Sequence, residues 1–287
     1  MDKLVLPKVT KEIIQKYGFR FSKQLGQNFL IDENILQKIV NGAAVSKEDW
    51  VIEVGPGIGT LTQALAQRAE KVIAVEIDKN LIPILEETLS PYPNVKIIHA
   101  DILKVDFHEL VEENIENPIK IIANLPYYVT TPIVMKFLEE KWPLHSLTLM
   151  VQKEVADRMR AAPGGKDYGA LSVAVQYYCH VEMIAKVPKT VFIPQPNVDS
   201  AVIRLTRLPE PSVRLKDEKV FFAVVKAAFG QRRKMLLNAL AGSALGFSKE
   251  RIQQVLAQTR IDGSRRGESL TIEEFAKLAN AFSERMA

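Results

Sequence analysis

An apolar run near the middle of the chain stops at an amide, in the stretch IIANLPYYVTT at residues 121–131. Asn124 is followed there by Leu125, Pro126 and Tyr127. The side-chain oxygen of Asn124 and the carbonyl of Leu125 can both accept hydrogen bonds from an exocyclic amino group. Two such acceptors would draw a conjugated nitrogen toward tetrahedral geometry and free its lone pair. If the substrate carries such an amino group, the stretch could make it nucleophilic. The simpler alternative is a tight turn with core aromatics behind it.

The residues around this turn suit the capture of a base. The ring of Pro126 fixes φ, and with it the turn that would present the Leu125 carbonyl. Tyr127 offers a face on which an extruded base can stack, worth about 1–3 kcal/mol in proteins that bind single strands. Holding the amine in line with its reaction partner can supply roughly 7–11 kcal/mol of the barrier. We interpret the second tyrosine, Tyr128, as a core aromatic.

A glycine-rich loop follows the apolar run at 50–54, in VIEVGPGIGT. Glycine permits positive φ and lets the backbone approach a ligand closely, so Gly55 and Gly57 are candidate cofactor contacts. The dinucleotide fingerprint G-x-G-x-x-G would need a third glycine where Thr60 stands. The pattern E-x-G-x-G-x-G is instead typical of methyltransferases that use S-adenosylmethionine. We therefore expect that methyl donor.

Two acidic residues stand at the ends of later apolar runs. Glu76 closes the second run, where a carboxylate can accept hydrogen bonds from two ribose hydroxyls. Asp101 follows the third run and is placed to accept from an adenine amino group. Both roles also suit NAD, so the pair indicates adenosine in general. Each acid could instead be a solvated residue at a strand end.

Strands and helices must alternate to position these residues. Seven apolar runs are expected as strands, at 50–54, 71–78, 95–101, 119–124, 145–152, 181–187 and 200–208. Helical stretches separate the first five, which predicts a parallel sheet covered on both faces. The last two could close one edge antiparallel. The fold class expected is α/β, a Rossmann-like methyltransferase domain with a mostly parallel seven-stranded sheet, whose ligands bind beyond the carboxyl ends of the strands.

The pattern changes after Leu208. The segment PEPSVRLKDE has the composition of a linker, and only helical patterns follow it, at 219–231, 232–245, 248–259 and 271–285. We therefore expect two domains: residues 1–207 form the α/β domain, and residues 208–287 form a small all-α domain.

Composition limits the class of protein. The chain has 287 residues, of which 47% are hydrophobic and 25% charged, and no apolar run reaches the length of a membrane span. The N-terminus lacks the apolar core of a secretion signal. One cysteine, Cys179, excludes an internal disulfide and fits a reducing cytoplasm. Four scattered histidines give no metal-ligand spacing. We expect a cytoplasmic protein, by default a monomer, without a metal or a membrane partner.

The charge is uneven along the chain, although its net value is only +4. Residues 207–287 hold 15 Lys and Arg against 9 Asp and Glu, and residues 1–25 hold 6 against 2. Such ends could hold a polyanion, or could simply solvate helix faces. The best candidates for phosphate contacts lie in GQRRKMLLN and SRRG, and are Arg232, Arg233, Lys234, Arg265 and Arg266.

Three separated motifs carry a family resemblance: KQLGQNFLID, NLPY and VFIPQPNVDSAV. With them the chain resembles the ribosomal RNA adenine N6-dimethyltransferases, over essentially its whole length and most closely the small-subunit (16S) branch. The resemblance implies transfer of methyl groups from S-adenosylmethionine to two adjacent adenosines in a hairpin loop near the 3′ end of 16S rRNA. It also implies a role in biogenesis of the small ribosomal subunit.

The resemblance also implies roles for particular residues. Asn28 and Leu30 would touch the cofactor from an N-terminal segment folded over it, and Phe192 would pack on the target base opposite Tyr127. Cofactor-contact positions of the family fall on Gly55, Glu76, Asp101 and Asn124. The proline-rich box, often P-P-P-K in the family, reads PQPN here, so no argument can rest on a lysine in it.

Simpler interpretations stand beside these. QNFLID could be a turn and helix start, with Asp32 as N-cap and Phe29 in the core, and Phe192 could be a core aromatic. Rival functions are a large-subunit (23S) rRNA methyltransferase of the macrolide-resistance type and a nicotinamide-dependent oxidoreductase. A non-catalytic RNA-binding assembly factor is a third. Thr60 and NLPY argue against the oxidoreductase.

Overall fold

The computed structural model describes residues 3–22, 24–106, 110–111, 118–140 and 142–284, so Lys23 of KQLGQNFLID lies outside the described residues. The chain forms two compact units. Unit 1 comprises residues 1–156 and 181–207, and unit 2 comprises residues 157–180 and 208–287. In the described part of the chain, no helix is long and apolar enough to cross a membrane.

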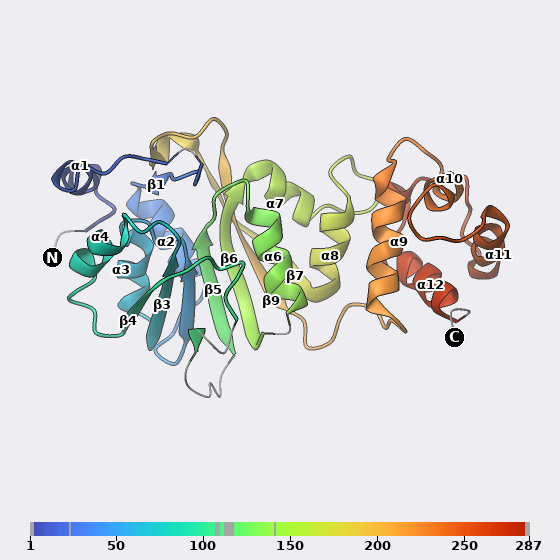
Figure 1. The fold of residues 1–287 in the computed structure, drawn as a ribbon, viewed down its shortest axis with the longest axis horizontal. Coiled ribbons are helices and arrows are strands. Elements are labelled where there is room, and N and C mark those ends of the chain that lie inside the picture. The colour runs from blue at the N-terminus through green and yellow to red at the C-terminus, as the bar shows by residue number, and fades with distance from the viewer. Residues whose placement is uncertain (1–2, 23, 107–109, 112–117, 141, 285–287) are drawn as a thin grey trace. The chain divides into compact units, whose positions relative to one another are not determined.

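Unit 1 is built on a sheet with strand order β4-β3-β2-β5-β6-β9-β7 (Figure 1). The strands are β2 (Trp50–Val54), β3 (Lys71–Glu76), β4 (Val95–His99), β5 (Ile119–Asn124), β6 (Leu144–Gln152), β7 (Cys179–Val187) and β9 (Ser200–Arg207). The pairs β2–β3, β3–β4, β2–β5 and β5–β6 are parallel, whereas β9 runs antiparallel to β6. The predicted α/β class and its mostly parallel seven-stranded sheet are confirmed.

The order of the strands reverses beside β2. Strands β3 and β4 lie on one side of it, and β5 and β6 lie on the other. The loops that leave β2 and β5 therefore diverge, which opens a crevice at the carboxyl ends of these two strands. Because Val54 is paired with Ala123, the glycine loop begins level with Asn124. Strand register alone thus brings together two motifs that are 70 residues apart in sequence.

Side chains on one face of the sheet pack against helices α2 (Glu33–Gly42) and α3 (Thr60–Ala66). Val51, Val72 and Ile122, from three neighbouring strands, belong to this core cluster. The remaining helical elements in the described part of unit 1 are α1 (Pro7–Lys16), α4 (Ile82–Thr88), α6 (Thr130–Glu139), η1 (Lys189–Val191) and the first part of α7 (Lys153–Met159). Because successive side chains of a strand point to opposite faces of the sheet, the strand register decides which residues enter this core.

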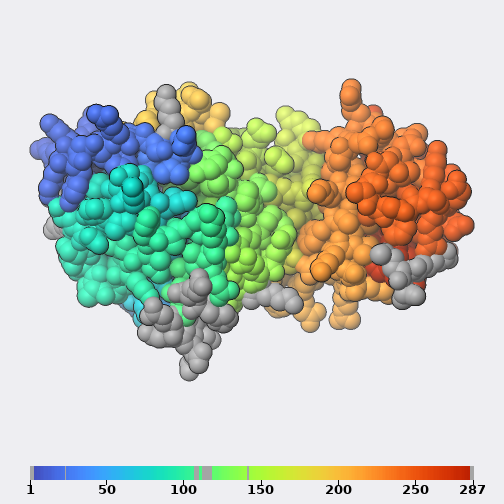
Figure 2. Space-filling model, viewed as in Figure 1, coloured from blue at the N-terminus to red at the C-terminus, as the bar shows by residue number. Residues whose placement is uncertain are grey.

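A second, two-stranded sheet attaches the N-terminal segment to the rest of unit 1. Strand β1 (Phe29–Leu30) pairs antiparallel with β8 (Phe192–Ile193). The ring of Phe29 also packs against Phe19 and Phe21, with centroids 5.8 and 5.1 Å away. In Figure 2 the blue N-terminal residues lie along the cyan and teal part of the chain. The sequence does not predict this sheet, because strands of two residues show no periodicity.

Unit 2 is helical. Its helices are α8 (Ala170–Tyr178), α9 (Glu218–Gly230), α10 (Leu236–Ala241), α11 (Lys249–Thr259), η2 (Gly267–Ser269) and α12 (Ile272–Ser283). Three of them begin at side chains that accept hydrogen bonds from backbone N–H groups, Asp217, Ser248 and Thr271. The helix expected at 232–245 starts later than its sequence pattern, since residues 231–234 form a turn.

Aromatic contacts explain why residues 157–180 belong to unit 2 although they precede residue 208. The ring of Tyr177 lies 5.3 Å from that of Phe221 and 5.6 Å from that of Phe222. Tyr168 packs edge-on against Phe229 at 5.7 Å. These contacts bury α8 against α9. The expected boundary after residue 207 rested on a change of pattern along the chain, which carries no information about such distant partners.

Candidate active site

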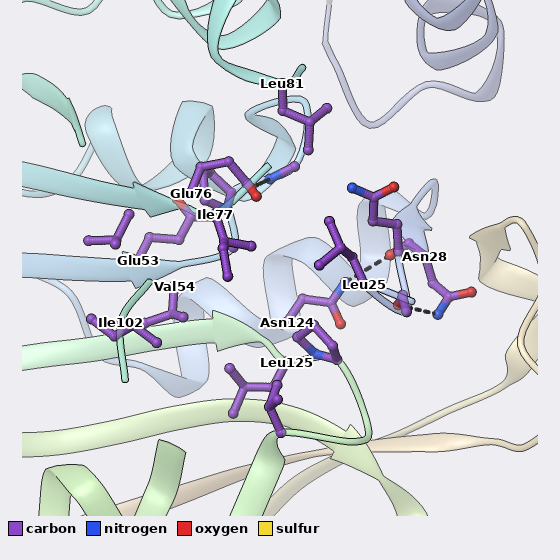
Figure 3. A pocket seen from close by; sticks show the side chains of 18 of the residues that line it. Leu25, Asn28, Glu53, Val54, Glu76, Ile77, Leu81, Ile102, Asn124 and Leu125 are labelled. Atoms are coloured by element: carbon purple, nitrogen blue, oxygen red, sulfur yellow. Dashed lines mark hydrogen bonds between the residues drawn. The ribbon is translucent and has the colours of Figure 1, made fainter. Parts of the chain in front are cut away.

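One pocket lies at the carboxyl ends of β2, β3 and β5 (Figure 3). It is lined by residues 25–30, 53–58, 60, 75–77, 81, 100–103, 124–129, 133 and 192. Every residue expected to act in catalysis, cofactor binding or base stacking lines it, namely Asn28, Leu30, Gly55, Gly57, Glu76, Asp101, Asn124, Leu125, Pro126, Tyr127 and Phe192. The structure thus brings together residues from six separate stretches of the chain.

The side chain of Asn124 is oriented by the N-terminal segment. Its Nδ2 donates to the backbone carbonyl of Asn28 over 3.0 Å (Figure 3). A carbonyl can only accept, so this contact selects the amide orientation that turns Nδ2 toward Asn28 and Oδ1 away from it. Asn28 is itself held, because its own Nδ2 donates to Gly26 O over 2.9 Å. Asn124 Oδ1 is thereby available as an acceptor at the end of β5.

The turn after Asn124 is fixed by its own hydrogen bonds. Leu125 is buried and donates its N–H to Met150 O on β6, at 3.1 Å. The carbonyl of Pro126 accepts from Val129 N and from Thr130 Oγ1, both at 3.2 Å. The locked φ of the proline and these contacts hold the backbone between strand and helix in one shape.

Tyr127 is anchored through its hydroxyl. The phenol oxygen lies 2.8 Å from Ser200 Oγ, at the start of β9, and Ser200 is buried. Burial, assisted by the charge of Asp199, raises the pKa of Tyr127, so the phenol stays protonated at neutral pH. The hydrogen bond therefore sets the direction in which the ring presents its face to the pocket.

Tyr128 is not a core aromatic, and that prediction was wrong. Its side chain is 58% exposed, yet it lines the same pocket as Tyr127. Tyr127 occupies the buried side of this turn, where its hydroxyl contacts Ser200. A Cβ placed on Gly26 would lie 3.7 Å from the ring of Tyr128, so this ring rests beside the N-terminal segment.

The glycine loop has the conformation that its sequence requires. Gly55 and Gly57 have φ of 70° and 63°, in the left-handed region that side chains disfavour. A Cβ on Gly55 would meet nothing within 4 Å, so the loop leaves open space in the pocket there. A Cβ on Gly57 would lie 3.1 Å from the ring of Phe29, so the N-terminal segment also closes tightly over the loop.

The two acids at strand ends differ in their surroundings. Glu76 is buried, with its oxygens accepting from Asp78 N at 2.8 Å and from Gly57 N at 3.3 Å. Burial raises the pKa of Glu76. Asp101 accepts from Leu103 N at 3.0 Å within its own turn. The alternative for Asp101, a solvated acid at a strand end, therefore stays open beside its place in the pocket wall.

Leu30 and Phe192 face each other across the small sheet. Leu30 pairs with Phe192 in register, and both side chains are buried in the core cluster while lining the pocket. Asp32 caps α2, with its Oδ1 accepting from Ile35 N at 2.9 Å, and Phe29 is buried. The simpler interpretation of QNFLID, as turn and helix start, is thus also correct. The segment QNFLID therefore leads into a helix and also forms part of the pocket wall.

Gln27 and Asp78 are positioning residues that the motifs did not single out. Gln27 Nε2 donates to Asp78 Oδ2 over 2.7 Å, and Gln27 Oε1 accepts from Ser22 N over 2.8 Å. The backbone N–H of Asp78 also donates a hydrogen bond to the carboxylate of Glu76. The N-terminal segment is therefore linked to the loop after β3 as well as to β5. Both residues stand next to motif positions, but nothing in their spacing says that they pair.

Comparisons with known proteins agree with this geometry. The model of the ribosomal RNA adenine dimethylase family matches residues 18–283. The chain belongs to this family. Its expected activity class, a methyltransferase of adenine in ribosomal RNA, is thereby confirmed. The nicotinamide-dependent oxidoreductase considered above is excluded.

Relatives match the chain from end to end. A ribosomal RNA small subunit methyltransferase A of Alkaliphilus oremlandii is 61% identical over 287 residues, covering all of both chains. The protein of that name from Clostridioides difficile is 57% identical, covering 100% of this chain and 99% of its own.

Two solved structures have a similar fold. A dimethyladenosine transferase from Plasmodium falciparum superposes with a TM-score of 0.76 and 26% identity, covering 89% of this chain and 98% of its own. The 23S rRNA methyltransferase ErmE gives a TM-score of 0.67 and 28% identity, covering 89% of this chain and all of its own.

The basic residues expected to meet RNA form one cluster within unit 2 of this adenine dimethylase family member. Leu236 N donates to Arg265 O over 2.6 Å, which brings the turn at 231–234 beside the loop at 263–266. Arg233, Lys234 and Arg266 are exposed. The cluster joins segments that are 30 residues apart in sequence.

Two arginines of this cluster have partners inside unit 2. Arg232 donates to Lys166 O over 2.6 Å and lies 3.3 Å from Glu268. Arg265 forms a two-pronged ion pair with Glu274 and donates to Ser269 O over 2.6 Å. These contacts hold the basic loops in place, so they leave less of either guanidinium for a phosphate.

Glu53, the acid of E-x-G-x-G-x-G, is a pocket residue whose role the sequence did not suggest. It is 1% exposed, and in the described part of the chain its Oε2 has no hydrogen-bond partner. Burial, with a smaller contribution from the charge of Glu76, raises the pKa of Glu53 to about 8. The carboxyl is therefore neutral in the folded protein at neutral pH. The described residues contain no group of three or more His, Cys, Asp or Glu side chains that could hold a metal ion.

Glu53 makes the stability of the folded protein depend on pH. A carboxyl whose pKa is higher in the folded state binds more protons there than in the unfolded state. The free energy of unfolding should therefore fall as pH rises from about 4.5 to about 8, by roughly 1.4 kcal/mol per pH unit at most. Glu53→Gln, which is neutral at every pH, should flatten this decline. Urea unfolding at about pH 5 and about pH 8 measures it.

The matched control is Glu48→Gln, because Glu48 is an exposed carboxylate on the same unit. That variant should keep the slope of the parent protein. An identical slope in the parent and in Glu53→Gln would show that Glu53 is ionised in the folded state and would contradict the expectation.

Proposed function

We propose that the protein transfers methyl groups from S-adenosylmethionine to N6 of two adjacent adenosines in a hairpin loop near the 3′ end of 16S rRNA, in the course of small-subunit biogenesis. The observation that carries this proposal is the contact of Asn124 with Asn28 O, which orients the amide of a residue that lines the same pocket as the glycine loop and Glu76. Relatives of 57–61% identity are named for the small subunit, whereas ErmE, named for 23S rRNA, is 28% identical. We place the enzyme with its RNA in the cytoplasm, as a monomer.

The pocket fits S-adenosylmethionine. The open space at Gly55 admits a ligand close to the backbone, and Glu76 at the end of β3 can accept hydrogen bonds from ribose hydroxyls. Asp101 and the exposed Ile77 and Leu103 line the side where an adenine would lie. When bound, the cofactor supplies an electrophilic methyl group on a sulfonium. Asn28 and Leu30 would cover it from the N-terminal segment.

The chain's own residues would prepare the target amine. Asn124 Oδ1 and the Leu125 carbonyl would accept the two N–H bonds of the adenine amino group, which localises the lone pair on nitrogen. Tyr127 and Phe192 would hold the base between them. No general base or metal is required, because a methylated amino group loses its proton to water readily. In this scheme most of the rate enhancement comes from positioning groups whose orientation is set before the substrate binds.

The proposed reaction is tested by incubation with labelled S-adenosylmethionine and small ribosomal subunits from cells that lack this methylation. Nucleosides from the digested RNA are then identified by mass. We expect labelled N6,N6-dimethyladenosine from a fragment near the 3′ end. Label that enters large-subunit RNA instead would assign the enzyme to the 23S class, and absence of label from both would refute the proposed acceptor.

Replacement of Asn124 should separate catalysis from binding. We expect Asn124→Ala to lower kcat by about 10²–10³, the loss typical when one preorganised polar group is removed from an active site. RNA binding should stay nearly intact, because the side chain is small and lies inside the pocket. Single-turnover transfer and filter binding measure the two effects. The control is Asn41→Ala at an exposed amide of the same unit. Normal turnover by Asn124→Ala would contradict the proposed mechanism.

The exposed part of the basic cluster should carry the salt dependence of RNA binding. Arg233→Ala and Lys234→Ala should each reduce the slope of log K against log salt by about 0.7 per lost phosphate contact. Arg265→Ala, which breaks the pair with Glu274, should chiefly lower the stability of unit 2. Affinity for 16S rRNA measured over a salt series distinguishes them. Unchanged slopes for the first two variants would assign those side chains to solvent.

A further inference from the structure

Tyr128 is an exposed aromatic ring in a pocket wall, and the reaction described above gives it no role. We propose that Tyr128 is the platform for the nucleotide next to the target adenosine, stacking on its base while the target base lies against Tyr127. The inference rests on the proposed function, because it requires an RNA strand that delivers one base into the pocket.

Tyr128 is an exposed residue of the pocket wall that lies beside the N-terminal segment. The residue follows the turn at Pro126, and its ring lies beside Gly26, at which φ is +58°. A Cβ on Gly26 would come within 3.4 Å of Pro126 Cβ and 3.7 Å of the ring. The backbone at Gly26 therefore supports the ring on one side, while 58% of the residue remains exposed. A supported aromatic face is a suitable stacking platform.

The position of Tyr128 selects the RNA as its ligand rather than the cofactor. The exposed apolar residues on the cofactor side, Ile77 and Leu103, follow the ends of β3 and β4 beside Glu76 and Asp101. Tyr128 instead belongs to the loop after β5, which carries Asn124 and Tyr127. Tyr128 directly follows Tyr127, the residue expected to stack on the target base.

The chemistry of single-stranded RNA fits this place. A nucleotide drawn into a pocket leaves its covalent neighbour at the mouth, and enzymes that extrude a base commonly read the flanking nucleotides. Tyr127 turns inward to Ser200, and Tyr128 remains in solvent. Tyr127 and Tyr128 can thus hold one base inside the pocket and the neighbouring base outside it.

The test compares steady-state methylation of undermethylated small ribosomal subunits by Tyr128→Ala, Tyr128→Leu and Tyr128→Phe. Truncation to Ala should raise KM for the subunit roughly tenfold, within the range that one stacked base contributes. The kcat should stay within about twofold, because the neighbouring base is not the reacting one. Tyr128→Leu, which keeps apolar bulk but has no ring, should behave like Ala. Tyr128→Phe should behave like the parent protein.

Two controls keep this result specific. Leu6→Ala removes another exposed apolar side chain of unit 1, outside the pocket, and should leave KM unchanged. The dissociation constant of S-adenosylmethionine, measured by calorimetry, should be the same for all Tyr128 variants.

Three results would overturn the inference while the parent enzyme still methylates its substrate. They are an unchanged KM for Tyr128→Ala, a fall in kcat without a change in KM, and full activity of Tyr128→Leu. A parent enzyme that methylates no small subunit would refute the proposed function instead.

Discussion

The hydrogen bond from Asn124 Nδ2 to Asn28 O is the contact on which the site depends. It spans 96 residues of sequence and joins the end of β5 to a segment that precedes the whole sheet. Because its acceptor is a backbone carbonyl, it leaves the amide of Asn124 only one satisfactory orientation. The side-chain amide of Asn124 is thus oriented by a backbone atom, which no side-chain substitution at residue 28 removes directly.

That contact exists only because other contacts hold the N-terminal segment in place. The β1–β8 pairing fixes its distal end, the Gln27–Asp78 hydrogen bond fixes its middle, and Phe29 packs over Gly57. Each partner sits on a loop that leaves the carboxyl end of the sheet or on the strand opposite β1. The segment therefore closes the site by touching the elements that carry Glu76 and Asn124. Its position is coupled to theirs.

The sequence predicted the parts of the site that depend on residue type alone. It did not predict features that depend on contacts with distant residues. Glycines with positive φ, an acid at a strand end and the NLPY turn each have a local physical reason, and each lies in the pocket. Ser200, Gln27 and the exposure of Tyr128 depend on which distant residue fills the neighbouring space. The place of residues 157–180 in the helical unit has the same cause, since Tyr177 needs Phe221 before it has anything to pack against. Periodicity along one segment cannot supply that information.

The polar groups of the pocket also show how far it is organised before any ligand binds. Asn124, Glu76 and Tyr127 all have protein partners that set their direction, so little reorientation remains for the moment of reaction. Glu53 is the exception, since one of its buried oxygens has no partner in the described part of the chain. A buried oxygen without a partner costs stability and is tolerated where a ligand can satisfy it. The same pocket therefore combines acceptors that are already fixed with one acid that a ligand can still engage.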